Sequence, residues 1–511
     1  MPKEKGIGVS ALVRTDDWLS VWIAFLVLSV LIAGFAVRMP DWKWMTADEF
    51  TQRIPGWRTQ LASLDETLTS TGATRLKAGI QALRAALDAR LREKIQDAAA
   101  KLSTLGDEEK NGDLRSRVKK LGTDIRTAAA QRFDRIFSWD NLKGGFFTLL
   151  GFWILGLLAT AFLREKVARF LVSFPLLFLI AAVSFLISGN SLVSSLGIEY
   201  VFWALLVGLF ISNVLGVPWW LKAAAKSELY IKTGLVLLGA EMLLGTILKA
   251  GAFGMIQAIV VIAAVWYVCY WLAGRFGLDK EFGAILATGV SVCGVSAAIA
   301  AGGALKGDPK KVSHTISLIL LCAVPMLVLQ PLVARLLAMP LMVAGAWIGG
   351  TIDTTGAVVA AGAITGGKAL DVAVVVKFAQ NALIGVVAFL LALWAALKGK
   401  QKGGERPRIS QIWERFPKFV LGFIAVSLVF SLAMSETTAK NITAITSGIR
   451  GLLFSLAFLS IGLETRFMDL IAMGRGRPAL TFLLAQLFNL AWTLLFAWLL
   501  FGGVLFPAPS L

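Results

Sequence analysis

The sequence predicts an all-α polytopic membrane protein, with about thirteen helices that cross the bilayer and one extramembrane insertion. Hydrophobic residues make up 57% of its 511 residues and the mean hydropathy is +0.74, above the range of soluble globular chains. Apolar runs close to or beyond the ~20 residues that cross a bilayer recur along most of the chain. Residues 38–141 lack such a run and carry helical periodicity instead.

Charge and cysteine content argue against several other classes of protein. The net charge of +18 comes mainly from Lys and Arg in loops and in the polar insertion, so membrane topology and anionic lipid explain it better than nucleic acid does. Cys269, Cys293 and Cys322 lie in apolar segments, with neither metal-ligand nor disulfide spacing. A single histidine, His314, argues against a histidine-rich metal site, and we expect no cofactor.

The first predicted domain, 1–37, is a cytoplasmic tail followed by the span Trp18–Val37, which has no signal-peptide cleavage pattern after it. The second, 38–141, is a polar helical hairpin of coiled-coil type, with its turn at 106–112. Apolar residues three and four apart predict its two helices: Leu76, Ile80, Leu83, Leu87 and Leu91, then Leu114, Val118, Leu121 and Ile125. The hairpin is either a partner-binding element or a spacer that self-associates, which would give a homodimer.

Residues 142–170 are predicted to hold an additional transmembrane helix and a cytoplasmic loop, and 171–511 a transporter domain with two inverted halves. After the first span, the predicted spans are 143–163, 171–189, 198–217, 229–250, 253–273, 282–304, 313–337, 341–366, 371–397, 416–434, 445–466 and 479–504.

Positive charge sets the predicted orientation. The loop Lys398–Lys418 is rich in Lys and Arg and should be cytoplasmic. Counting spans outward from it places the N-terminus in the cytoplasm and the hairpin in the periplasm. Lys306, Lys310 and Lys311 alone fall on the wrong side of this count, as a broken or re-entrant helix nearby would cause.

A short internal echo is compatible with repeated halves. The sequence Leu238-Gly239-Ala240-Glu241 resembles Ile461-Gly462-Leu463-Glu464, and Gly251 and Gly474 follow at similar distances. Inverted repeats are common in transporters. Chance, or similar packing at two helix ends, would produce the same match, and both glutamates are expected near membrane interfaces.

The segment Ala287–Gly303 lies in an apolar region but is almost free of large side chains. Its small and polar positions include Ser291, Cys293, Gly294 and Ser296. A break at Val292–Val295 would leave a half-helix whose first N–H groups bind an anion. Close packing of small residues against a neighbouring helix is the alternative.

A second such segment, Trp347–Gly362, contains Asp353 among hydroxyl residues. Thr351, Thr354 and Thr355 could bind an ion or an oxyanion, and Asp353 could carry a coupling proton. Alternatively, Asp353 caps a half-helix that starts at Thr354. Both interpretations imply an interrupted helix.

Lys377 is the next charged residue within a span, and Gln380 and Asn381 lie one turn on and on the same helix face. A buried lysine beside amides suits an anionic substrate or an ion pair with Asp353, whereas a lysine near a helix end snorkels to the interface. His314 is either an interfacial residue or a proton-linked gate. The sequence has no Walker motif, nucleophile elbow, metalloprotease helix or dinucleotide fingerprint, which favours a transporter over an enzyme.

Several blocks of sequence resemble the YeiH-type sulfate exporter family, and the resemblance covers about 171–511. The blocks are Tyr230–Met242, Ser291–Leu305, Gly349–Gly362, Val374–Leu383 and Leu456–Leu463. The resemblance implies inverted repeats with crossing broken helices, related to bile-acid and sodium–proton antiporters, in a bacterial inner membrane. It also implies secondary transport of an anion, nominally sulfate or a sulfonate. The family's S-x-C-G block matches Ser291, Cys293 and Gly294, and its lysine matches Lys377.

The sequence departs from the family at two places. Asp353 stands where the family has histidine and Thr354 where it has an acid, and Gln380 replaces an arginine. The loss of a potential cation at both places weakens the inference of a doubly charged substrate, and could indicate another anion or a cation bound at Asp353.

We therefore expect a transporter of a small anion, coupled to protons or sodium through Asp353 and His314. The expected substrate-binding residues are Ser291, Cys293, Gly294, Ser296, Thr351, Thr354, Thr355, Lys377, Gln380 and Asn381. Two alternatives remain: a sodium–proton antiporter that uses Asp353 and Lys377, and a membrane scaffold or sensor that acts through the hairpin.

Overall fold

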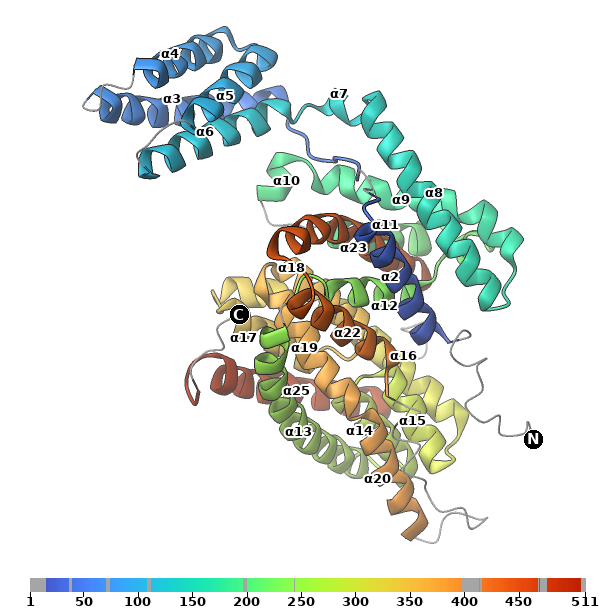
Figure 1. Cartoon of the computed structure of the whole chain (residues 1–511). Coiled ribbons are helices and arrows are strands. Elements are labelled where there is room, and N and C mark those ends of the chain that lie inside the picture. The colour runs from blue at the N-terminus through green and yellow to red at the C-terminus, as the bar shows by residue number, and fades with distance from the viewer. Residues whose placement is uncertain are drawn as a thin grey trace. The chain divides into compact units, whose positions relative to one another are not determined.

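The structure is a computed structural model that describes residues 15–35, 39–69, 74–107, 112–195, 200–242, 244–397, 413, 416–466, 468 and 476–506. The expected cytoplasmic tail, most of the loop 398–418 and Gly474 lie outside the described residues. Every regular element in these ranges is a helix, and the β pairing found there is one isolated bridge between Trp44 and Asn190 (Figure 1).

The chain forms two compact units, Arg38–Leu150 with Phe185–Tyr200, and Met1–Val37 with Gly151–Ser184 and Val201–Leu511. The first contains α3 (Ala47–Thr69), α4 (Thr74–Ala89), α5 (Arg92–Asp107), α6 (Gly112–Ala130), α7 (Phe133–Ile136) and α10 (Ser191–Ser195). Two long helices, α8 (Trp139–Phe162) and α9 (Val167–Ser188), contribute residues to both units.

The polar insertion contains four long helices, α3 to α6, and the short α7, instead of the two helices that were expected. Arg90 has a φ of 53°, which ends α4 and leaves Leu91 outside the helix with 51% of its surface exposed. The additional helix α3 buries Phe50, Ile54, Trp57, Leu61 and Leu64 against the apolar stripes of α4, α5 and α6. Pro55 lies inside α3, although proline disfavours a helix interior.

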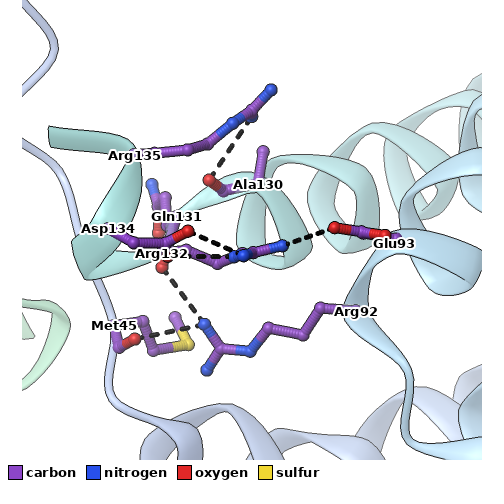
Figure 2. A network of polar contacts seen from close by, with 8 residues as sticks. All are labelled: Met45, Arg92, Glu93, Ala130, Gln131, Arg132, Asp134 and Arg135. Atoms are coloured by element: carbon purple, nitrogen blue, oxygen red, sulfur yellow. Dashed lines mark hydrogen bonds and ion pairs between the residues drawn. The ribbon is translucent and has the colours of Figure 1, made fainter. Parts of the chain in front are cut away.

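A polar network joins the segments where the chain enters and leaves these four helices (Figure 2). The backbone N–H of Met45 donates to the carbonyl of Gln131 at 2.9 Å. The Arg92 guanidinium donates to the carbonyls of Met45, Thr46 and Gln131. Arg132 pairs with Glu93 and with Asp134, at 2.9 and 2.6 Å. These contacts close the bundle at its base.

The second unit holds most of the apolar helices. These are α2 (Asp16–Ile32), α11 (Tyr200–Phe210), α12 (Ser227–Leu238), α13 (Leu244–Arg275), α14 (Lys280–Ser291), α15 (Val295–Leu305), α16 (Pro309–Leu336), α17 (Leu341–Thr351), α18 (Thr355–Thr365), α19 (Lys368–Ala382), α20 (Ile384–Leu397), α22 (Lys418–Leu432), α23 (Glu436–Glu464) and α25 (Arg477–Phe501).

Seven helices among the described residues are long and apolar enough to cross a membrane. They are Trp139–Phe162, Val167–Ser188, Ala250–Arg275, Pro309–Leu336, Lys368–Ala395, Thr437–Glu464 and Arg477–Phe501. Shorter apolar helices, of 10–17 residues, lie between them. The chain is therefore a multi-pass membrane protein, and the count of about thirteen spans stays a prediction.

The two segments singled out for their small residues are both interrupted. The predicted span 282–304 is divided into α14 and α15, and the predicted span 341–366 is divided into α17 and α18. The interruptions comprise Val292–Gly294 and Ile352–Thr354. The break predicted at Val292–Val295 is therefore present, and the small residues Gly289 and Gly294 also pack closely against Ile319 of the neighbouring helix α16.

The first interrupted pair returns to the side on which it starts. Lys311, at the start of α16, pairs with Asp279 and Glu281 at the start of α14, at 2.9 and 3.2 Å. The backbone N–H of Asp308 also donates to Glu281 at 3.0 Å. Helices α14 and α15 thus form a hairpin whose two ends lie together, which is compatible with the re-entrant helix expected near Lys306, Lys310 and Lys311.

The second interrupted pair, α17 and α18, also forms a hairpin, and both of its helices pack against α19. A Cβ added to Gly345 or Gly349 would lie 2.5 Å from the carbonyl oxygens of Ala369 and Ala373, so α17 runs parallel to α19 at close range. Thr355, at the start of α18, contacts Asn381 at the far end of α19, so α18 runs back in the opposite direction. The tips of both hairpins are therefore at their interruptions.

Candidate functional site

The two hairpin tips touch each other at Gly294 and Asp353. Gly294 has a φ of +67°, and a Cβ added to it would lie 2.9 Å from the carbonyl oxygen of Asp353. Glycine is needed here for its left-handed backbone and for the close approach of the second tip. The absence of a side chain at Gly294 thus permits the two hairpin tips to come into contact.

Lys377 of α19 ties the two tips together. Its ammonium donates to the carbonyl oxygen of Val292 at 3.0 Å, to that of Ile352 at 2.9 Å and to Oε1 of Gln380 at 3.0 Å. An ammonium has three protons, so all its donors are used. Only 1% of the residue is exposed. The positive charge therefore lies at the carbonyl ends of α14 and α17, where the helix dipoles are negative.

Side-chain amides satisfy further carbonyls at the second tip. Gln380 Nε2 donates to the carbonyl of Gly350 at 2.9 Å, and Gln486 Nε2 donates to that of Thr351 at 2.9 Å. Gln330 Nε2 donates to the Thr351 hydroxyl at 2.6 Å. The sequence reasoning missed Gln330 and Gln486, although uncharged amides in mid-span are a usable signal because burial requires them to find partners.

A cavity of about 700 Å³ begins where α15 and α18 begin. Its lining includes Cys293, Val295 and Ser296 at the first helix start and Thr354, Thr355 and Gly356 at the second, with Asn381 beside them. The first turn of a helix presents N–H groups without intrahelical partners and a positive dipole end. Two such ends at one cavity make a place that favours negative charge.

Side chains at the start of α18 fix its geometry. The Thr354 hydroxyl accepts a hydrogen bond from the backbone N–H of Ala357 at 3.3 Å and so caps the helix, which is the role considered above for Asp353. Asn381 Nδ2 donates to the Thr355 hydroxyl at 3.1 Å, which leaves the proton of that hydroxyl available. The Thr355 hydroxyl in the cavity wall is thus oriented by Asn381 and can donate a hydrogen bond to a ligand.

Five of the expected substrate-binding residues line the cavity, and the others lie behind it. The lining residues are Cys293, Ser296, Thr354, Thr355 and Asn381. Ser291, Gly294, Thr351, Lys377 and Gln380 do not line it, and neither do Asp353 and His314. Lys377 was expected to be a charged ligand, but its ammonium instead bonds the backbone carbonyls of the two hairpin tips.

Buried polar atoms without a hydrogen-bond partner in the described structure include Oδ2 of Asp353 and the hydroxyl of Ser291, and each of these residues is 2% exposed. Oε1 of Gln330 and Oε1 of Gln486 at the second tip also have none. His314 lies against the ring of Phe282 at 5.8 Å, away from the cavity lining. No group of three His, Cys, Asp or Glu residues able to hold a metal occurs in the described ranges.

Charged residues form the open rim of the cavity. Lys232 pairs with Asp17 at 2.9 Å and with Glu228 at 3.2 Å, and Glu464 and Arg466 are exposed beside them. The Ser227 hydroxyl donates to Glu464 Oε2 at 3.2 Å. The charged rim therefore contains both signs, in contrast to the helix starts at the other end of the cavity.

Comparison with known proteins places the chain in a family. The family described as Conserved hypothetical protein 698 matches residues 173–481. A UPF0324 membrane protein of Rhodopirellula baltica is 36% identical over 96% of this chain and 90% of its own length. Another, of Nitratidesulfovibrio vulgaris, is 38% identical over 68% of this chain and 62% of its own length, so the chain spans less than two thirds of that relative.

A further UPF0324 membrane protein, of Nitrosomonas europaea, is 33% identical over 60% of this chain and 69% of its own length. No solved structure matches the chain. The match to Rhodopirellula baltica extends over nearly the whole chain, including the part before residue 171 where the sequence blocks gave no resemblance. The family resemblance of those blocks is confirmed, and the chain belongs to the UPF0324 family of membrane proteins.

Proposed function

We propose that this chain is a secondary active transporter of a small anion, such as an organic sulfonate or sulfate, held where α15 and α18 begin. The observation that carries the proposal is the cavity of about 700 Å³, lined by the starts of two half-helices at the hairpin tips. Discontinuous helices with N-termini directed at an anionic group are a recurring design of transporter sites.

The charge balance favours a singly charged substrate. Each helix start is equivalent to about +0.5 elementary charge, so two of them offset about one negative charge. Lys377 adds little to this, because its ammonium is already bonded to the carbonyls of Val292 and Ile352. A monoanion such as a sulfonate fits this balance. A dianion such as sulfate would need a proton or a cation as well, for which Asp353 is the candidate carboxylate.

Transport further requires the site to open on each side in turn. The proposed frame is a pair of inverted halves in the inner membrane, with the N-terminus in the cytoplasm. On that orientation the charged rim faces the cytoplasm and the polar insertion lies in the periplasm. We propose that the insertion is a spacer or a dimer contact, because nothing in the transport site depends on it.

Thermal stabilisation of the purified protein tests the proposal. A ligand that binds the folded state raises the melting temperature by mass action. The panel contains sulfate, sulfite, thiosulfate, taurine-like sulfonates and carboxylates, each with and without sodium and at several pH values. We expect sulfonates to give the largest shift.

The matched variants are Thr355→Val and Thr365→Val. Both threonines lie on α18, but Thr355 lines the cavity, whereas the Thr365 hydroxyl donates to the carbonyl of Ala361 at 2.8 Å. A hydrogen bond to a charged ligand contributes about 1.5–3 kcal/mol, so Thr355→Val should weaken binding at least tenfold and Thr365→Val should not. A response to sodium or pH alone, with no anion effective, would instead favour the sodium–proton antiporter.

A further inference from the structure

We infer that Glu241 with Arg450, and Glu464 with Ser227, are the two gates of this transporter, one closed and one open. The inference rests on the proposed function, because it assigns the residues that close each end of the transport path. It follows from the contacts of α12 and α23, which pack side by side (Figure 1). The two helices run in opposite directions, because Ser227 contacts Glu464 and Glu241 contacts Arg450.

The two glutamates lie at opposite ends of this helix pair. Just beyond the end of α12, Glu241 accepts from Nε and Nη2 of Arg450, each at 2.8 Å. At the end of α23, Glu464 accepts from the Ser227 hydroxyl at 3.2 Å. Ser227 precedes Arg450 in the sequence by the same number of residues as Glu241 precedes Glu464. The two contacts therefore occupy matching positions in the two halves.

The glycines that precede the glutamates make matching contacts too. A Cβ added to Gly239 would lie 2.4 Å from the carbonyl oxygen of Phe423 in α22. One added to Gly462 would lie 2.6 Å from that of Leu205 in α11. Each glycine thus packs against the helix that comes before its partner helix in the sequence. This reciprocal exchange is what two halves related by a two-fold axis produce.

The matching contacts differ in access to the cavity and in the groups that make them. Glu464 and Ser227 line the cavity. Arg450 and Glu241 do not, and their side chains are only 12% and 16% exposed. A bidentate pair of arginine and carboxylate is rigid and directional. The end of the helix pair at Glu241 is therefore held shut by two charged hydrogen bonds, while the end at Glu464 is held by one hydroxyl and stays open.

A charged residue of α19, the helix whose Lys377 bonds both hairpin tips, also interacts with the closed gate. Asp371, in the first turn of α19, interacts electrostatically with both Arg450 and Glu241. Lys377 on the same helix holds both tips.

Cys293 provides a reporter of access from the Glu464 side, because it lines the same cavity as Ser227 and Glu464. The experiment measures its reaction with a membrane-impermeant maleimide in sealed vesicles of both orientations. The full chain carries Cys269→Ser and Cys322→Ser, since neither of these buried cysteines lines the cavity. No substrate is added, so the result does not depend on whether an anion binds. In the parent chain we expect labelling from the side of the Glu464 rim.

Arg450→Gln should raise the labelling rate from the opposite side about tenfold, because the closed gate loses its ion pair. Ser227→Arg should lower labelling from the rim side by a similar factor, because it builds the missing ion pair with Glu464. Exchanging the charges, with Glu241→Arg and Arg450→Glu together, should restore the parent pattern. Lys440→Gln, which removes an exposed charge from the same helix α23, is the matched control and should change neither rate.

The gates are refuted if Arg450→Gln and Glu241→Gln both keep the parent sidedness while retaining the parent melting temperature. If Arg450→Gln does not fold, Glu241→Gln removes the same ion pair and decides the closed gate alone. If Ser227→Arg does not fold, Ser227→Lys supplies the cation for the open gate. If no anion binds but the gate variants still change the side from which Cys293 is labelled, the proposed substrate is refuted and the gates are supported.

Discussion

Replacement of Lys377 by methionine, which keeps the length of the side chain and removes its charge and donors, should destabilise the protein strongly. The ammonium bonds two buried carbonyls and one buried amide oxygen. Each buried acceptor that loses its partner costs about 1–3 kcal/mol. Three such losses, partly offset by the burial cost that the charge no longer imposes, give about 3–5 kcal/mol.

The assay is thermal unfolding of the detergent-purified protein, with Lys368→Met as the matched control. Lys368 begins the same helix and is exposed, so its replacement should cost less than about 1 kcal/mol. If Lys377→Met melts at the parent temperature but no longer binds an anion, Lys377 is a ligand and its structural role is refuted. If it unfolds earlier, the hairpin tips depend on it.

Three further predictions concern the tips and the insertion. Gly294→Ala should lower stability by about 2 kcal/mol or more in the same assay, because of its positive φ and the carbonyl of Asp353, whereas Gly274→Ala, with open space around it, should not. Arg92→Ala should raise hydrogen exchange across 112–130 about tenfold or more, because the carbonyls that it bonds lie at the base of the bundle, while Lys101→Ala on the same helix should leave exchange unchanged. The hydrogen bond and ion pair with Arg132 lower the pKa of Asp134, so its stabilising effect is present above the unfolded pKa of about 3.9 and is lost as the pH falls through the lower folded value. Asp134→Asn should therefore remove the acid-dependent part of exchange at the bundle base, and an unchanged pH profile would contradict the assignment.

Much of the site could be predicted from the types of residue present in short segments of the sequence. An interruption was expected near Asp353 and was one of two alternatives at Val292–Val295, and both helix breaks are present. Five residues expected to bind the substrate line the cavity. Small residues permit a break wherever they occur, so this inference needed no knowledge of distant segments.

The contacts of the charged residues could not be read in the same way. Lys377 was expected to face an anion or Asp353, but its donors are used by carbonyls that the two breaks expose. Glu241 was expected at an interface, but it pairs with Arg450 from a helix far along the chain. In each case the partner is a group that only the folded chain brings near.

The four helices of the insertion illustrate the same division. Apolar spacing predicted helices through Leu76–Leu91 and Leu114–Ile125, and both are present, although the first ends at Ala89 and excludes Leu91. The division at Arg90 and the burial of α3 depend on how these stripes pack against one another.

By itself, the sequence determined the membrane class, the helical fold, the family and the positions of the two breaks, because composition, periodicity and residue size act locally. Only the tertiary structure decided that each broken pair returns to its starting side, that the tips cross at Gly294, and that one cavity collects two helix starts. The physical reason is that a freed carbonyl or N–H must find a partner somewhere in the fold, and the sequence does not say which distant group supplies it.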